Sequence, residues 1–367
     1  VDRLALPING RIGPDGGLTI SGECRQLRWQ RIELSGLRLD SRQIGICGHR
    51  GGPLFAYGPG GMRGGVTLPA VTLTGSSGGS PMTLTSRGGE YGLGNSGFSL
   101  DGVDLLIGQG DGATRFAADR MTGGVSAGQF GGTLSGIEAK IGPVPLNLRD
   151  GAGDWRYATG QLSLDGRLNI SDTATDPRFQ PMVTNDLRIA LADGRVVATG
   201  ALREAESSAH VADLIIHHSL TTGDGDARFT LPGLTFAREG LQPIALTNLA
   251  GGVIVNAEGR VSGAGLIEWD GRGVTSSGDF ATDRLDFAAA FGPVQRLAGR
   301  IHFNDLLNLS TPPGQRATLG SVNPGVEVTD GQLLYQMLPG QQVRIESGRW
   351  PFAGGTLLLQ PALLDFS

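Results

Sequence analysis

Long apolar runs, basic clusters and aromatic side chains are all scarce in this sequence of 367 residues. No stretch approaches the roughly 20 apolar residues that a membrane-spanning helix requires. Lys and Arg number 30 against 35 Asp and Glu, without a basic run, which argues against a nucleic-acid-binding protein. Aromatic residues make up only 6% of the chain, so the predicted interior consists mainly of Leu, Ile, Val and Ala.

Glycine, in contrast, is abundant, with 62 residues. It lacks the three-residue period of collagen, and it costs roughly 1 kcal/mol per residue in a helix interior, which excludes long helical bundles. Leu, Ile, Val and Phe recur along the whole chain and the net charge is only −5, so a disordered chain is excluded too. The composition therefore favours an all-β fold with very little helix.

Apolar and polar residues alternate in many short segments, most clearly over residues 161–170. There Leu162, Leu164, Leu168 and Ile170 share one parity, and polar residues or glycine occupy the positions between them. On a β-strand this pattern gives one apolar face and one solvated face. Similar alternation indicates roughly 20 to 25 strands of ordinary length in the whole chain. Further examples lie at 17–20, 66–68, 71–73, 98–100, 261–269 and 343–345.

Asp-Gly and Pro-Gly pairs separate these segments and predict hairpin turns, since their residues tolerate the positive φ that such turns need. They are Asp15-Gly16, Asp101-Gly102, Asp111-Gly112, Asp193-Gly194, Asp330-Gly331 and Pro339-Gly340. Consecutive hairpins favour an antiparallel sheet, and its apolar face must be covered. We therefore predict a long, curved, mostly antiparallel sheet folded into an elongated groove, with short helical turns only at 286–291 and 305–309.

The best internal boundary is the Pro-containing segment 171–181. The residues before and after it show the same alternation of apolar and polar residues interrupted by glycine, so one continuous β-groove is expected. We assign residues 1–175 to its N-terminal part and residues 176–367 to its C-terminal part.

The only two cysteines, Cys24 and Cys47, favour a structural disulfide if the compartment is oxidising. Closing this loop would stabilise the fold by about 3 kcal/mol in the chain-entropy model. Two free buried thiols are the alternative. A zinc site is not expected, because His49 alone does not complete a ligand set.

Other short motifs give no catalytic, cofactor or metal site. Gly92–Gly97 spells GxGxxG, but a strand follows it where a dinucleotide site needs a helix. His217 and His218 are adjacent on a predicted strand, so their side chains point to opposite faces. Gly223–Asp226 holds two acids, too few for a calcium loop.

The last quarter of the chain carries a resemblance to a known family. The segments Thr311–Gln315, Asn323–Val326 and Gly348–Gly355 resemble the YdbH type of the AsmA-like proteins of Gram-negative bacteria. The resemblance covers residues 294–367, extends more loosely over 234–291, and matches the first half only in style. From the residue types alone, without the resemblance, we expect Trp350 and Phe352 to pack at a corner where a strand ends.

The resemblance implies a periplasmic, non-catalytic bridge that is tethered to the inner membrane and moves phospholipids between the inner and outer membranes along an apolar β-groove (β-taco). It also implies a membrane anchor outside this chain and a small outer-membrane lipoprotein that joins by strand addition at a free sheet edge. The chain is then a portion of a longer protein. The groove walls are predicted from strand parity. They are Leu162, Leu164, Leu168, Ile170, Val253, Val255, Ile267, Trp269, Val343 and Ile345.

Two other functions stay open at this point. A structural β-solenoid that binds partners by its edges would have a closed core and no lipid cargo. A polysaccharide-acting β-helix enzyme would need clustered carboxylates and exposed aromatics on one face, and the scattered acids and low aromatic content count against it.

Overall fold

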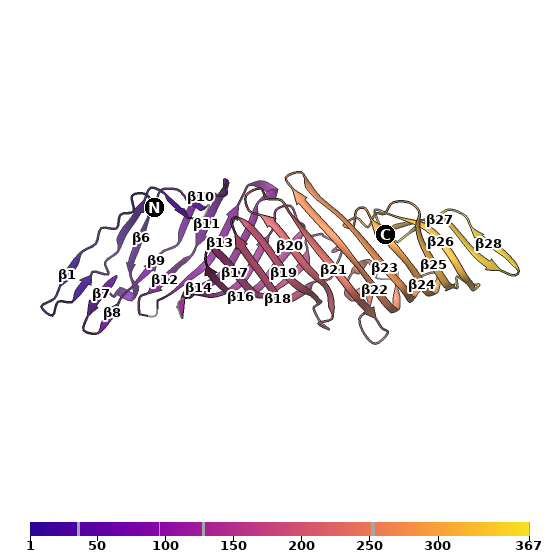
Figure 1. The fold of residues 1–367 in the computed structure, drawn as a ribbon, viewed down its shortest axis with the longest axis horizontal. Coiled ribbons are helices and arrows are strands. Elements are labelled where there is room, and N and C mark those ends of the chain that lie inside the picture. The colour runs from indigo at the N-terminus through magenta and orange to yellow at the C-terminus, as the bar shows by residue number, and fades with distance from the viewer. Residues whose placement is uncertain (35–36, 95, 127–128, 251–253, 367) are drawn as a thin grey trace. The chain divides into compact units, whose positions relative to one another are not determined.

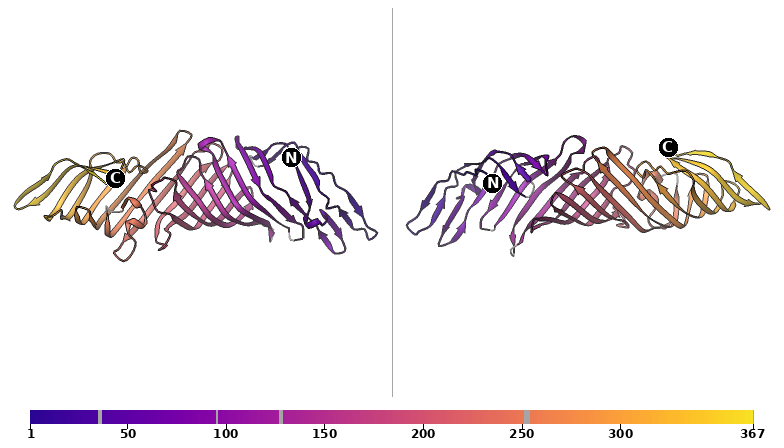
Figure 2. Two further views of the ribbon diagram at one scale, coloured as in Figure 1. Left: turned by 180° about the vertical axis from the view of Figure 1, so that it is seen from behind. Right: turned by 45° about the horizontal axis from the view of Figure 1, so that its top comes forward.

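The computed structural model describes residues 1–34, 37–94, 96–126, 129–250 and 254–366 (Figure 1). Strands account for 69% of the protein and helices for 3%, which confirms the all-β prediction. One antiparallel sheet contains 25 strands, and a second contains the four strands β1, β2, β7 and β8. Successive hairpins lie side by side within each sheet segment, as both views of Figure 2 show.

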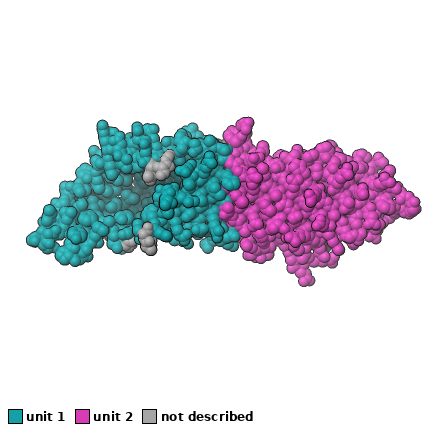
Figure 3. Space-filling view, viewed as in Figure 1, with its two compact units in different colours: residues 1–169, 185–198, 217–224 teal, residues 170–184, 199–216, 225–367 magenta. Residues whose placement is uncertain are grey.

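The chain forms two compact units (Figure 3). Unit 1 comprises residues 1–169, 185–198 and 217–224, and unit 2 comprises residues 170–184, 199–216 and 225–367. Four strands contribute residues to both units. They are β17 (Gln161–Asp172), β18 (Met182–Ala192), β19 (Arg195–Glu204) and β20 (His210–Ser219).

Unit 1 contains most of the short strands. Its strands are β1 (Gly10–Ile12), β2 (Leu18–Ile20), β3 (Arg25–Trp29), β4 (Ile32–Leu34), β5 (Leu37–Leu39), β6 (Arg42–Gly48), β7 (Phe55–Gly58), β8 (Gly61–Arg63), β9 (Gly65–Leu68), β10 (Val71–Ser77), β11 (Ser80–Ser86), β12 (Gly88–Gly92), β13 (Gly97–Ile107), β14 (Thr114–Ser126), β15 (Gln129–Lys140) and β16 (Leu146–Ala158). Its 3₁₀ turns are η1 (His49–Gly51) and η2 (Gly110–Gly112).

Unit 2 contains the longest strands. Its strands are β21 (Gly225–Phe236), β22 (Val255–Asp270), β23 (Gly273–Ala289), β24 (Gly292–Phe303), β25 (Gln315–Val322), β26 (Val328–Leu338), β27 (Gln342–Phe352), β28 (Gly355–Leu359) and β29 (Ala362–Asp365), and the longest are β22 and β23. Its 3₁₀ turns are η3 (Pro243–Ala245) and η4 (Asn248–Ala250).

The sheet of unit 1 divides at β13. One edge of β13 pairs with β12 over residues 97–101 and with β11 over residues 104–107. Arg87 connects β11 to β12, and its backbone N–H donates to the carbonyl of Asp101 at 2.8 Å. Its side chain lies over Gly102, where a Cβ would be 2.6 Å from the guanidinium. One branch therefore continues through β12, β9, β6 and β3, and the other through β11, β10, β5 and β4.

A line of irregular residues crosses the strands of unit 1, on β13, β15 and β16. Gly102, Gly136 and Asp150 have positive φ values of 57°, 61° and 54°. Gly102 lies opposite Asp119 on β14, and a Cβ at Gly136 would overlap the Asp119 carboxylate. The register of β15 and β16 shifts around Gly136 and Asp150, and such bulges bend a strand and increase its twist. We call this line the crease of unit 1.

Unit 2 has a crease of the same kind from β21 to β26. The strand register shifts beside Gly233, beside Gly259 and between Thr282 and Leu285. Arg296 and Asp330 continue the line with φ values of 49° and 54°. The sheet of each unit is thus bent along a line that crosses its strands.

Arginine side chains close the crease of unit 2 over glycines. Arg260 donates to the carbonyl of Pro232 at 2.9 Å and fills the space above Gly233. Arg296 donates to the carbonyl of Gly320 at 3.1 Å in the same way. The bulged carbonyls therefore keep hydrogen-bond partners although the regular ladder is interrupted there.

Two of the predicted hairpin turns are wrong. Asp101-Gly102 lies inside β13 and Asp330-Gly331 lies inside β26, where Gly102 and Asp330 have a positive φ on the crease line and the chain does not turn back. The helical turn predicted at 286–291 is also wrong, because strand β23 continues to Ala289 and a tight turn follows. Residues 305–309 form turns in the loop between β24 and β25, not a helix. The alternating segment 161–170 is confirmed as part of β17.

Candidate functional site

An apolar row crosses the strands of unit 1 on one face. Phe98 pairs with Gly123, and Gly132 pairs with Trp155, so these residues share that face. The glycines leave room for the rings, because a Cβ at Gly123 would lie 2.4 Å from the Trp155 ring and 2.5 Å from the Phe98 ring. Trp155 Nε1–H donates to the carbonyl of Thr122 at 2.8 Å. The indole therefore lies flat across β15 and reaches β14.

This row belongs to a buried cluster beside the crease of unit 1. Leu134 and Ile137 lie on either side of Gly136 and are both in the cluster. A sheet whose apolar residues meet across a bend is bent toward its apolar face, and we call this side the concave face. The buried members are Ala118, Leu134, Ile137, Trp155 and Leu164, and the half-buried neighbours are Phe98, Phe116, Met121, Leu162 and Ile189.

Three aromatic rings gather at the margin of this cluster. The Phe130 ring lies 5.2 Å from the Trp155 ring in an edge-on arrangement and 6.0 Å from the Phe98 ring. Phe130 is 40% exposed, whereas Trp155 is 2% exposed. Exposure therefore increases across the concave face, from the packed interior at Trp155 to the accessible apolar border at Phe130.

The concave face of unit 2 holds two further clusters beside its crease. In the first, Leu231 and Leu234 flank Gly233. Its buried members are Val211, Ala212, Leu234, Phe236 and Ala257, and its half-buried neighbours are Met182, Leu202, Phe229, Leu231, Leu241, Leu246, Ile254, Val261, Leu285 and Phe287. The second contains Val294, Leu319, Val322, Val328 and Trp350, bordered by Phe287, Leu297 and Leu333. Half-buried apolar residues outnumber the buried ones in the first of these clusters.

The opposite face is polar in both units. Glu90 pairs with Ser99 and Ser99 with Thr122, and the Thr122 and Thr133 hydroxyls lie 2.7 Å apart. In unit 2, a His302 ring nitrogen lies 2.9 Å from the carboxylate of its cross-strand partner Asp279. Each unit therefore separates an apolar concave face from a polar outer one.

Asp172, Glu204 and His218 are buried titratable residues outside these clusters. Burial alone would raise the pKa of Asp172, but two hydrogen bonds from the Arg178 side chain, at 2.6 and 2.7 Å, and backbone N–H donors lower it to about 2. Burial lowers the pKa of His218, whose Nε2 lies 3.1 Å from the Thr114 hydroxyl. These contacts fix the ends of strands, and we assign them no role in binding.

Most predicted groove residues are buried or half-buried. Leu164, Leu168, Ile170, Trp269 and Ile345 are between 3% and 8% exposed, and Leu162, Ile267 and Val343 are half-buried. Val255 is 49% exposed, and Val253 lies outside the described residues. Only Leu162 and Leu164 contribute to the three clusters, so the structure does not unite the predicted set into one site.

Sequence reasoning missed the aromatic residues of unit 1. Phe98, Phe130 and Trp155 are far apart in the chain. The only sequence signal for their contact is the glycines that lie beside the rings on neighbouring strands and leave room for them. Trp350 is packed at 5% exposure against Gly331, as expected for a corner, but Phe352 is 42% exposed and seals nothing in the structure.

Cys24 and Cys47 form a disulfide in unit 1, next to the paired strands β3 and β6. Across the described ranges, no group of three or more His, Cys, Asp and Glu residues is arranged to hold a metal ion. No helix among these residues has the length and apolar character needed to cross a membrane.

An antiparallel sheet that is creased within each unit, apolar on the concave face and polar on the other, is typical of an all-β protein that can hold apolar ligands. Residues 2–367 match the YdbH-like family, described as intermembrane phospholipid transport protein YdbH, and the chain belongs to this family. The family has a role in lipid transport and is not a known enzyme family. No curated protein and no solved structure gives a significant match.

Proposed function

We propose that this chain is a segment of a periplasmic bridge that carries phospholipids between the inner and outer membranes without catalysis. The acyl chains lie against the concave faces of the two units, and the head groups stay in water. The single observation that supports this is the border of half-buried apolar side chains around each buried cluster, such as Leu162 and Val261.

Energetics favour such a surface. Exposing an acyl chain to water costs about 0.8 kcal/mol per CH₂ group, so a chain of around 16 carbons costs on the order of 10 kcal/mol. A continuous apolar face removes most of this barrier without any catalytic residue. It gives the movement no direction, so any driving force lies in other parts of the assembly.

The proposed bridge needs attachments at both ends. In our proposal, a segment outside this chain anchors the protein in the inner membrane, and a small outer-membrane lipoprotein pairs with a free sheet edge. Unpaired backbone N–H and C=O groups at an edge strand provide the hydrogen bonds for such strand addition.

Neighbouring residues on β17 allow a direct test. Leu162 and Ser163 are both half-buried, but the alternation of the strand places them on opposite faces. A photoreactive amino acid at position 162 should crosslink to phospholipid in cells, and the same group at position 163 should not. Val261 and Ser262 on β22 offer a second matched pair in unit 2.

Substitutions at the same positions separate a groove from a closed core. Leu162→Glu should lower the amount of phospholipid that co-purifies, measured by native mass spectrometry and lipid extraction, while the protein stays folded. Ser163→Glu is the control. Unfolding of Leu162→Glu, together with equal crosslinking at positions 162 and 163, would support the closed-core structural protein instead.

A further inference from the structure

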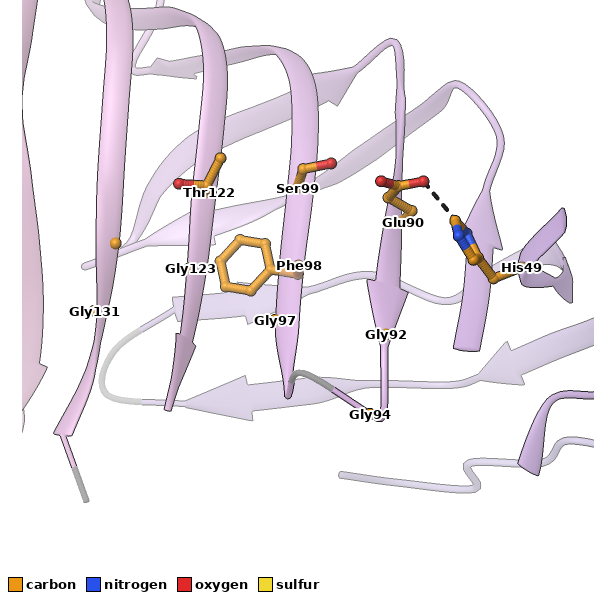
Figure 4. A pocket seen from close by; sticks show the side chains of 11 residues that line it. His49, Glu90, Gly92, Gly94, Gly97, Phe98, Ser99, Thr122, Gly123 and Gly131 are labelled. Atoms are coloured by element: carbon orange, nitrogen blue, oxygen red, sulfur yellow. Dashed lines mark ion pairs between the residues drawn. The ribbon is translucent and has the colours of Figure 1, made fainter. Parts of the chain in front are cut away.

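Unit 1 has a cavity of about 590 Å³ that the lipid-binding proposal does not use (Figure 4). Four polar side chains, His49, Glu90, Ser99 and Thr122, line it together with glycine backbone. Glu90, Ser99 and Thr122 are cross-strand neighbours and lie at the same height on β12, β13 and β14 in Figure 4. They belong to the face opposite the Phe98 and Trp155 rings.

The floor of the cavity lies on a row of glycines that crosses five strands. Each one pairs with the next, from β9 through β12, β13 and β14 to β15. The row is Gly65, Gly92, Gly97, Gly124 and Gly131, of which Gly92, Gly97 and Gly131 line the cavity. Since Gly97 and Ser99 are two residues apart on one strand, the glycine row lies on the same face as the polar row. The result is a shallow trough with a flat floor and a hydrogen-bonding wall.

The polar wall repeats at the spacing of the strands, about 4.8 Å. Glu90 presents a carboxylate, and Ser99 and Thr122 present hydroxyls that both donate and accept. His49 stands at one end, with its Nδ1 atom 3.3 Å from a Glu90 oxygen. That Nδ1 atom is buried and has no hydrogen-bond partner of good geometry within the described residues.

The chemistry of the lining selects a class of ligand. Neither Lys nor Arg lines the cavity, and Glu90 would repel a phosphate. The apolar side chain in the lining is Phe98, whose ring lies over Gly123 toward the other face, so an acyl chain gains little there. Hydroxyl groups of a neutral ligand match a wall of carboxylate, imidazole and hydroxyls.

We infer that this trough binds a neutral polyhydroxyl ligand that lies across the strands, with one sugar ring over each step of the polar wall. A linear chain of pyranose rings and the sugar head group of an uncharged glycolipid share this chemistry. The site goes beyond the proposed lipid path, because it lies on the other face of the sheet.

Two probes distinguish the sources of the ligand. The first is a soluble tetrasaccharide of β-1,4-linked N-acetylglucosamine, measured by isothermal titration calorimetry. The second is a set of phosphatidylcholine vesicles with and without an uncharged galactolipid, measured by flotation. We expect saturable binding of at least one probe to the full chain. Tetrasaccharide binding assigns a free sugar chain, and flotation that depends on galactolipid assigns a glycolipid head group.

Variants of the wall test the location of the site. Glu90→Gln should weaken binding by about tenfold or more, since hydrogen bonds to charged groups contribute more than neutral ones. Ser99→Ala should weaken it by about threefold to tenfold. Ser163→Ala, on a strand outside the cavity, should leave affinity unchanged. Absence of binding to both probes, or equal affinity of the folded variants and the parent, would overturn the site, whatever the phospholipid content of the sample.

Discussion

The indole N–H of Trp155 on β16 donates to the backbone carbonyl of Thr122 on β14, two strands away, at 2.8 Å. The ring crosses β15 at Gly132, which is its cross-strand partner. One side chain thus joins three strands of unit 1 next to the crease. Because the ring occupies space that Gly123 and Gly132 leave free, the packing of the concave face depends on these two small residues.

Trp155 should therefore be among the most costly side chains to remove from unit 1. Trp155→Ala should lower the free energy of unfolding by about 3–5 kcal/mol, as for other buried large-to-small changes. Trp155→Phe should cost less, because it keeps most of the ring and loses the hydrogen bond. Urea unfolding followed by circular dichroism gives both values. Tyr157→Phe on the same strand, at a residue 39% exposed, is the control and should change little.

The arginine over the unit 2 crease should be coupled energetically to the glycine beneath it. A Cβ at Gly320 would lie 2.2 Å from Arg296 Nε, so Gly320→Ala should destabilise the protein by about 1–3 kcal/mol. In the Arg296→Ala background the same change should cost clearly less, since the clash is gone. A double-mutant cycle by urea unfolding measures this coupling. Additive effects would show that the contact is not energetically important.

Asp172 should make stability depend on pH in the acid range. Its pKa falls from the ordinary value of 3.8 to about 2 on folding, so the unfolded chain binds the proton more tightly. Stability from this group is therefore fully present above about pH 5 and is lost as the pH falls toward 2, with a total of about 2 kcal/mol. Asp172→Asn should be less stable at pH 7 and should flatten this part of the profile. An unchanged slope between pH 5 and 2 would contradict the assignment.

The disulfide should stabilise the first strands of unit 1. Cys24 and Cys47 are 23 positions apart, and reduction should lower stability by about 3 kcal/mol in the chain-entropy model. Hydrogen exchange should then increase first in β3 and β6, which pair next to the bond. The Cys24→Ser/Cys47→Ser double variant should behave like the reduced protein and should not respond to reductant.

The sequence predicted the strands well where one face of a strand is apolar. In β17, Leu162 to Ile170 keep a single parity, so the pattern could be recognised without knowing the partner strands. Asp101-Gly102 and Asp330-Gly331 were misassigned for a local reason. A hairpin turn and these crease positions both have a positive φ, and only the position of the neighbouring strand decides between them.

The candidate sites could be predicted less well, because they depend on register. Phe98, Phe130 and Trp155 meet across three hairpins, and the five-glycine row of the trough is assembled from five strands. Neither arrangement leaves a local pattern in a sequence with glycine throughout. The predicted groove residues remain a prediction, and of these Leu162 and Leu164 join the cluster of unit 1.

The crease also has a consequence for how such a protein can change over evolutionary time. In each unit the irregular positions of neighbouring strands line up across the sheet, so neighbouring hairpins form similar slices of the creased sheet. Duplication or loss of one hairpin would change the sheet by about 10 Å without disturbing the slices on either side. The length of a creased sheet and its cross-section are then separate traits, and selection can change the one without the other.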